Sequence, residues 1–192
     1  MNPEFDFEPA ATALETVVAA ITDDQLTLPT PCADMTVRDL LVHVVELTEA
    51  FRQAATKEAV GRSVDPDTNQ ERPLVPDWRG RIPAQAKALV SAWREPAAWD
   101  DVTEAGGVTL PAPVMAMVAL DELVIHCWDL AKATGQEPRF DPADLGVLVE
   151  FLADTPPEGT PGLFGPVVPI PAEAPVLHRV LGLTGRDPAW TP

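Results

Sequence analysis

Three ionisable residues, Glu122, His126 and Asp129, lie within the apolar segment ALDELVIHCWDLAKATG at residues 119–135. Their spacings of four and three residues place them on one face of a helix, because each residue turns an α-helix by about 100°. A buried carboxylate costs several kcal/mol unless it is paired or binds a metal, and a buried imidazole needs partners for both nitrogens. The pattern therefore indicates either a metal site or a closely paired polar cluster.

His43 supplies a second imidazole that faces apolar surroundings, within the helical pattern of residues 37–55. Together with Glu122 and His126 it forms a candidate set of three metal ligands on two helices. His and carboxylate donors suit Zn²⁺ and also Ni²⁺, Fe²⁺ or Mn²⁺, and three protein ligands leave a position for water or substrate. The alternative is that Glu122 and His126 pair with each other while His43 is an ordinary core histidine.

Other polar residues near this set have less direct roles. Glu46 lies about one turn from His43 and is either a fourth oxygen donor or a solvated side chain. Asp129 either orients a ligand histidine or joins a surface ion pair. Cys32 precedes the helix of His43, and at about 1.5 Å rise per residue it is expected more than about 10 Å from His43, as an apolar plug rather than a ligand.

The remaining residues of chemical interest are expected to be structural. Cys127 points away from His126 into the core, and His178 lies on an exposed helix face. Four tryptophans are expected to pack rather than to form a substrate platform, namely Trp93, Trp99, Trp128 and Trp190.

Four long helical segments must position these side chains. Small and apolar residues recur at helical spacing near residues 8–21, and Thr36 with Asp39 resembles a capping box at the start of 37–55. A third helix is expected over residues 82–95, with Pro83 in its first turn. The fourth follows a link at 104–113 and ends at Gly135, which is a typical left-handed cap.

Strand signals are few, so the pattern predicts an all-α protein built on a four-helix bundle. Shorter helices are expected at residues 141–155 and near the C-terminus. A Pro- and charge-rich connection at about 61–82 leads into the third helix. We expect residues 1–155 to form the bundle and residues 156–192 to form a Pro-rich extension, with short helices, that packs on it.

Composition excludes several classes of partner. The 192 residues carry a formal charge of −17, which repels phosphate backbones and anionic membranes. No apolar run approaches the roughly 20 residues of a membrane helix, and the acidic start lacks the parts of a signal peptide. We therefore expect a cytoplasmic protein, without nucleic-acid or membrane partners, whose two cysteines are reduced.

Three segments together carry a family resemblance: PTPCADMTVRDLLVHVVE, LDELVIHCWDLAKATGQ and FGPVVPIPAEAPVLHRVLGLTGRDPAW. The chain resembles the actinobacterial mycothiol-dependent maleylpyruvate isomerase-like metal-binding proteins, within the DinB/YfiT-like four-helix bundles. The resemblance implies metal ligands at His43, Glu122 and His126. Met35 stands where that family often has Trp. Only about 57 residues follow Gly135, which is too few for the second α/β domain of the true isomerases, so isomerase activity is not implied.

The resemblance favours a metal-dependent S-transferase, with mycothiol as co-substrate and Zn²⁺ as the metal. The metal would ionise the small thiol, which would attack an electrophilic substrate, and Asp129 would at most orient a ligand. The same residues would also suit a DinB-like metal-dependent hydrolase or a non-enzymatic metal- or small-molecule-binding bundle. The sequence leaves the electrophile open, as well as the choice between monomer and homodimer.

Overall fold

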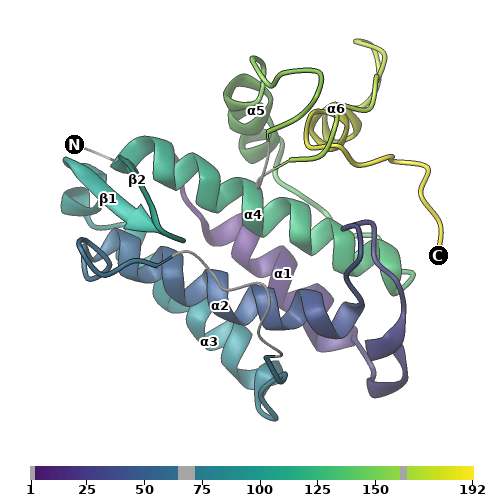
Figure 1. Ribbon diagram of the computed structural model, residues 1–192, viewed down its shortest axis with the longest axis horizontal. Coiled ribbons are helices and arrows are strands. Elements are labelled where there is room, and N and C mark those ends of the chain that lie inside the picture. The colour runs from purple at the N-terminus through teal and green to yellow at the C-terminus, as the bar shows by residue number, and fades with distance from the viewer. Residues whose placement is uncertain (1–2, 65–71, 161–163) are drawn as a thin grey trace.

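A four-helix bundle forms the body of the protein, in a computed structural model that describes residues 3–64, 72–160 and 164–192. Its helices are α1 (Glu8–Ala20), α2 (Val37–Ala55), α3 (Trp78–Trp93) and α4 (Ala112–Ala133). Helices α1 and α2 each pack against both α3 and α4 (Figure 1). The predicted all-α bundle is thus confirmed.

Aromatic side chains fill one end of the bundle core. Trp93 and Trp99 are almost fully buried, with ring centroids 5.6 Å apart. The indole nitrogen of Trp93 donates to the Phe51 carbonyl at 3.1 Å, and that of Trp99 donates to the Trp93 carbonyl at 2.7 Å. A buried indole needs such an acceptor. Trp128 is also buried, whereas Trp190 is half-buried.

The start of α2 follows its predicted signal. The Thr36 hydroxyl accepts from the backbone N–H of Asp39 at 3.3 Å, and the Asp39 carboxylate accepts from the backbone N–H of Thr36 at 3.0 Å. This reciprocal pair satisfies two amide donors at the helix N-terminus. It also fixes the rotation of α2, which carries His43.

Helix α3 begins earlier than predicted, at Trp78, so Pro83 lies inside the helix instead of in its first turn. A proline there removes one backbone hydrogen bond. Contacts of the added turn offset this loss: Trp78 is buried, and Arg79 donates to the Ile21 carbonyl at 3.1 Å while its guanidinium stacks on the Trp78 ring. Tertiary packing outweighs the local stop signal.

A β-hairpin that was not predicted overlaps the link at 104–113 and begins two residues before it. Strands β1 (Val102–Ala105) and β2 (Val108–Pro111) pair antiparallel. Gly106 and Gly107 have φ of 55° and 76°, as a two-residue type I′ turn requires. Two short 3₁₀ helices, η1 (Asp23–Thr27) and η2 (Pro96–Trp99), lie in other connections.

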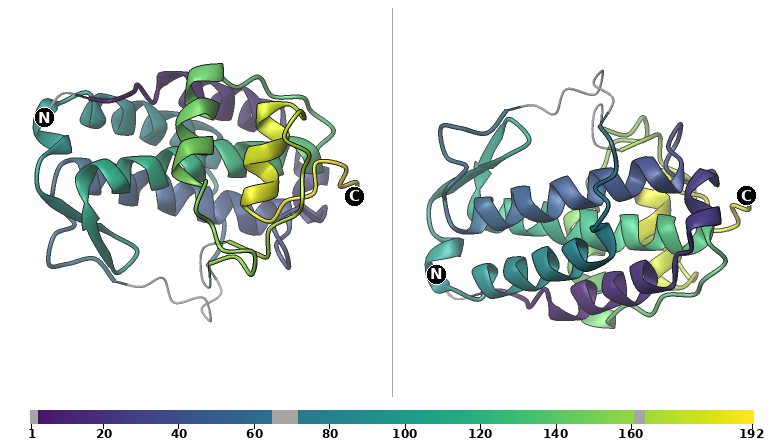
Figure 2. Two further views of the ribbon diagram at one scale, coloured as in Figure 1. Left: turned by 90° about the horizontal axis from the view of Figure 1, so that it is seen from above. Right: turned by 90° about the horizontal axis from the view of Figure 1, so that it is seen from below.

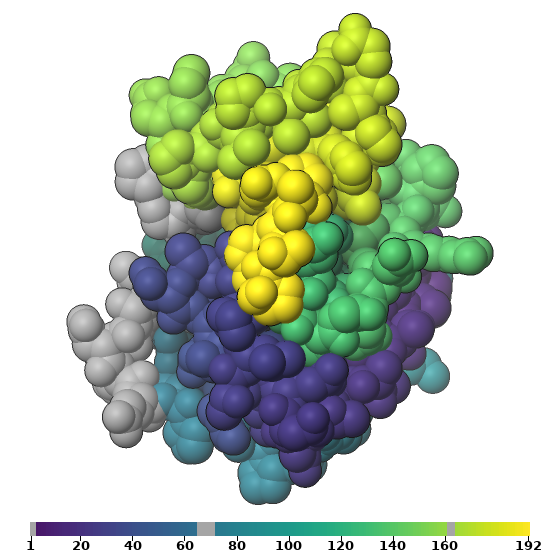
Figure 3. Space-filling view, turned by 90° about the vertical axis from the view of Figure 1, so that its right-hand side faces the viewer, coloured from purple at the N-terminus to yellow at the C-terminus, as the bar shows by residue number. Residues whose placement is uncertain are grey.

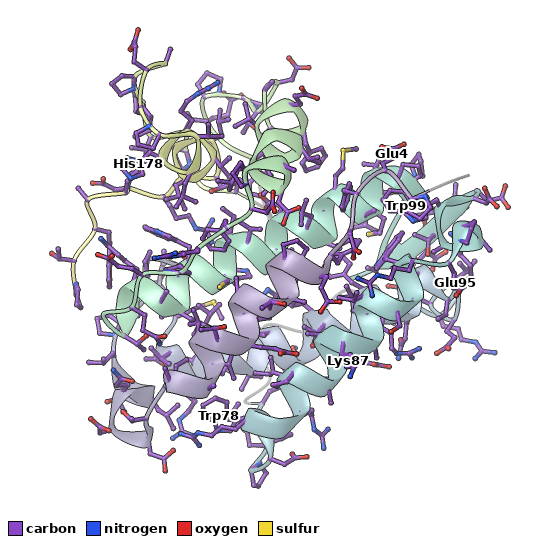
Figure 4. The ribbon with its side chains drawn as sticks, turned by 180° about the vertical axis from the view of Figure 1, so that it is seen from behind. Glu4, Trp78, Lys87, Glu95, Trp99 and His178 are labelled. Carbon is purple, nitrogen blue, oxygen red and sulfur yellow. The ribbon has the colours of Figure 1, made fainter. Side chains whose placement is uncertain are left out.

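Two shorter helices, α5 (Pro142–Phe151) and α6 (Val176–Leu183), lie side by side across α4 (Figure 2). Both were expected from the sequence, and α5 packs against α4 and α6. His178 is exposed on α6, as predicted (Figure 4). The division of the chain at residue 155 stays a prediction. The expected connection at 61–82 and the extension at 156–192 include residues 65–71 and 161–163, which lie outside the described residues.

No helix among the described residues is both long and apolar enough to cross a membrane.

Candidate metal centre

Helices α2 and α4 bring His43, Glu122 and His126 together. The Glu122 Oε2 atom lies 3.3 Å from Nε2 of His43 and 3.0 Å from Nε2 of His126. The two imidazole rings are nearly perpendicular, with centroids 4.9 Å apart. One potential ligand atom from each residue lies within 4.8 Å of the other two. Two imidazoles and one carboxylate form a donor set that fits a divalent metal such as Zn²⁺.

The cluster is buried on one side and open on the other. The His126 and Glu122 side chains are 9% and 19% exposed, whereas His43 is 38% exposed. Access from solvent therefore lies on the His43 side. A metal held by these three donors would be open to solvent on that side.

Electrostatics within the cluster favour a positive charge between the two helices. Burial alone would raise the pKa of the Glu122 carboxyl, but the neighbouring imidazoles hold it below its usual range. Burial would lower the pKa of His126, yet the carboxylates of Glu122 and Asp129 raise it to about 9. The negative charge of the two carboxylates would stabilise either a metal cation or a proton on His126. The pairing of Glu122 with His126, which the sequence left open as an alternative to a metal site, is present in the structure.

Asp129 orients the His126 ring. Its Oδ2 atom lies 3.1 Å from Nδ1 of His126, and its side chain is fully buried, which excludes a surface ion pair. A carboxylate at Nδ1 fixes the tautomer in which Nδ1 carries the hydrogen, so that Nε2 is free to bind a metal. The first of the two roles considered for Asp129 thus agrees with the structure.

Arg186 is a residue of this site that the sequence analysis missed. Its Nη2 atom donates to Oδ2 of Asp129 at 3.1 Å, and its side chain is 10% exposed. Figure 3 shows the C-terminal residues, in yellow, lying against both the early part of the chain and α4. The sequence pointed to Arg186 only indirectly. Its segment TGRDPAW is part of the family resemblance, but nothing in that segment assigns the arginine a role.

Local structure at the end of α6 places Arg186. Gly185 has φ of 79°, its N–H donates to the Gly182 carbonyl at 3.1 Å, and the Arg186 N–H donates to the Leu181 carbonyl at 2.8 Å. These two bonds form a Schellman motif, which ends a helix and reverses the chain. A side chain at position 185 would also meet Gly165 at 3.0 Å. Glycine at position 185 therefore makes this chain reversal without strain, and the reversal leads into Arg186.

Cys32 lies closer to the site than expected. The rise of α2 predicts only how far Cys32 lies from His43 along the helix axis. In the structure its sulfur lies within 4.8 Å of a ring nitrogen of His126 and of an Asp129 carboxylate oxygen, because its loop folds back toward α4. The Thr30 hydroxyl stabilises this loop by donating to the carbonyls of Cys32 and Met35, at 3.1 and 2.9 Å. Burial raises the pKa of the Cys32 thiol.

Glu46 and Cys127 do not join the cluster. The Glu46 carboxylate forms an ion pair with Arg72 and belongs to neither group of metal-capable side chains found among the described residues. Cys127 is fully buried, which raises the pKa of its thiol, and it packs in the core as predicted. Neither residue is therefore part of the candidate donor set.

Asp121 is a second residue that the sequence analysis missed. It is 2% exposed, and its Oδ1 atom has no hydrogen-bond partner. Burial, and next the charge of Glu122, raise its pKa to about 8. The carboxyl is therefore mostly neutral at pH 7, which keeps a further negative charge away from Glu122.

Fold and donor set together define a four-helix-bundle protein with a candidate centre of two histidines and one glutamate. The family model of the mycothiol maleylpyruvate isomerase N-terminal domain matches residues 7–131, which include all three of these residues. The chain belongs to this family, as the sequence resemblance implied.

Comparisons with known proteins agree with this assignment. An uncharacterized protein of Mycobacterium tuberculosis, designated Rv0738 in one strain and MT0763 in another, is 30% identical over 203 residues. That alignment covers 97% of this chain and 98% of the relative. The crystal structures of the mycothiol-dependent maleylpyruvate isomerase and of its histidine-to-alanine mutant each match with a TM-score of 0.52 at 16% identity. Each match covers 76% of this chain and 66% of the isomerase chain, and at this identity it shows a shared fold.

Proposed function

We propose that the protein is a metal-dependent S-transferase-like enzyme that uses a small thiol, mycothiol, against an electrophilic substrate. The observation that carries this proposal is the cluster of His43, Glu122 and His126, with its solvent-accessible edge at His43. Membership of a family whose description names mycothiol supports the choice of thiol. Cytoplasmic localisation and the choice between monomer and homodimer stay predictions.

A bound divalent metal, Zn²⁺ above all, would supply the chemistry by ionising a thiol at neutral pH. In this proposal His43, Glu122 and His126 hold the metal, and the Glu122 carboxylate offsets part of its charge. Asp129 accepts the Nδ1 hydrogen of His126, so that Nε2, which faces Glu122, is the ring nitrogen left to hold the metal.

The protein's own thiols are poor candidates for the nucleophile. Burial raises the pKa of both Cys32 and Cys127, so both are largely protonated at neutral pH. A thiolate is the reactive form of a thiol. An external thiol that ionises at the metal is therefore the better nucleophile, and no side chain needs to take that part.

The first experiment tests the site by elemental analysis of the purified protein. We expect stoichiometric metal in the wild type and in His178→Ala, which removes an exposed histidine of α6, and almost none in His126→Ala. Metal-free wild-type protein would overturn the proposal.

The second experiment tests the chemistry in Co²⁺-substituted protein. Addition of mycothiol should change the visible absorption bands and add a thiolate-to-cobalt charge-transfer band. Bands that do not respond to mycothiol would overturn the transferase assignment. In that case the same three residues would support either metal-dependent hydrolysis or a non-enzymatic binding role.

A further inference from the structure

His126 belongs to two clusters of potential ligands. The second contains Cys32, His126 and Asp129, with one donor atom from each lying within 4.8 Å of the other two. Thiolate, imidazole and carboxylate are all good ligands for Zn²⁺, and the thiolate also suits softer metals. Judged by donor type alone, this second cluster competes with the first for a metal.

A fixed cation already lies at the second cluster. The Arg186 guanidinium donates to Oδ2 of Asp129 at 3.1 Å and to the Thr184 carbonyl at 2.9 Å. Its charge also acts on Cys32, where it lowers the thiol pKa against the larger effect of burial. A guanidinium does not lose its proton in proteins, so this positive charge is permanent.

The second cluster retains capacity for a metal. Oδ1 of Asp129 is buried and has no hydrogen-bond partner, although Oδ2 is shared by His126 and Arg186. Cys32 is half-buried; its thiol contacts the soft sulfur of Met35 at 3.5 Å and also hydrogen-bonds with the Arg186 side chain. What opposes a metal here is therefore the adjacent positive charge rather than a shortage of donors.

We propose that Arg186 is a specificity-determining residue of the metal centre: its guanidinium takes the place of a second cation and confines the metal to His43, Glu122 and His126. Arg186 thereby keeps Asp129 as the acceptor for Nδ1 of His126 and keeps Cys32 out of the coordination sphere. This inference rests on the proposed metal site. It also gives the C-terminal region, which lies beyond the 7–131 match to the family model, a part in the centre.

The test is the absorption spectrum of Co²⁺-loaded protein without added thiol. Wild-type protein should lack a thiolate-to-cobalt charge-transfer band. In Arg186→Gln the cation is removed, and this band should appear as Cys32 enters the coordination sphere. It should disappear again in the double variant Cys32→Ser, Arg186→Gln. Arg186→Lys keeps a positive charge and should restore the wild-type spectrum.

Arg179→Gln is the matched control, because it removes the same charge from α6 outside both clusters; its spectrum should equal that of the wild type. Arg186→Met is a second neutral variant in case the glutamine variant does not fold. A thiolate band in the wild type, or its absence from a folded, cobalt-loaded neutral variant, would overturn the role of Arg186 while leaving the metal site intact. Wild-type protein that binds no metal would overturn both proposals.

Discussion

The two clusters that share His126 have similar donors but different electrostatic surroundings. In the first, Glu122 contacts two imidazoles and, among the described residues, pairs with no arginine or lysine. In the second, Asp129 pairs with the buried guanidinium of Arg186. Both clusters bring donors that suit a divalent metal within 4.8 Å of one another, so donor distances alone do not select one cluster over the other. In our proposal, the permanent charge of Arg186 beside the second cluster decides which of these donors a metal can use.

The largest expected effect contrasts His43→Ala with Cys32→Ser. Removing a ligand of the first cluster should weaken Zn²⁺ binding by more than the roughly 10–100-fold that the loss of an outer-shell partner costs. Removing the thiol of the second cluster should leave the affinity close to that of the wild type. Competition with a chromophoric chelator measures both. Equal losses in the two variants would mean that the metal uses donors from both clusters.

Asp129→Asn tests the ion pair of the second cluster in metal-free protein. The substitution keeps the shape of the side chain but leaves the buried Arg186 charge without its anion. Breaking a buried pair in this way costs about 3 kcal/mol or more. Urea denaturation should show a clear loss of stability, and the double variant Asp129→Asn, Arg186→Met should recover part of it. A single variant as stable as the wild type would contradict a buried, charged pair.

Asp144 differs from Asp129, which pairs with Arg186: it is a buried carboxyl whose Oδ2 atom has no hydrogen-bond partner among the described residues. It is 4% exposed, and burial, followed by the charges of Asp141 and Asp6, raises its pKa to about 6 from an ordinary 3.8. A raised carboxyl pKa contributes stability below about pH 4, and this is lost as the pH rises through 6.

Asp144→Asn should therefore stabilise the protein at pH 7.5 by on the order of 2 kcal/mol, and by much less at pH 4. Urea denaturation at the two pH values measures this difference. Asp154→Asn, at an exposed position just after α5, is the control and should change little at either pH. A pH-independent effect at Asp144 would show that packing, not charge, is responsible.

The smallest effect concerns the reactivity of Cys32. Because burial raises its pKa, iodoacetamide should label Cys32 more slowly than free cysteine at pH 8, and the rate should rise with pH. Arg186→Gln, measured without metal, should slow the reaction further, since the guanidinium lowers this pKa. Mass spectrometry of digested protein distinguishes Cys32 from the fully buried Cys127. Faster labelling in the variant would mean that access, not charge, controls the thiol.

Local sequence signals predicted much of the bundle. The capping box at Thr36 and the left-handed glycine at Gly135 fixed the start of α2 and the end of α4, and both are present. The start of α3 could not be read in this way, because it depends on the burial of Trp78 against distant residues. The hairpin was missed although its Gly106–Gly107 turn is a recognised signal.

The candidate site was likewise predicted in part from the sequence. Helical spacing and the family resemblance together selected His43, Glu122 and His126, and the structure brings them together; that they bind a metal stays a prediction. The sequence could not place Cys32 or Arg186, because their positions depend on a folded-back loop and on the chain reversal at Gly185. Both contacts join segments that are far apart along the chain.

X-ray absorption spectroscopy at the zinc edge shows directly which cluster holds the metal in the Zn²⁺-loaded protein. We expect nitrogen and oxygen neighbours at about 2.0–2.2 Å and no sulfur until mycothiol is added, when one sulfur at about 2.3 Å should appear. A zinc–sulfur distance in the protein before any thiol is added would contradict the account, because it would place the metal in the cluster of Cys32.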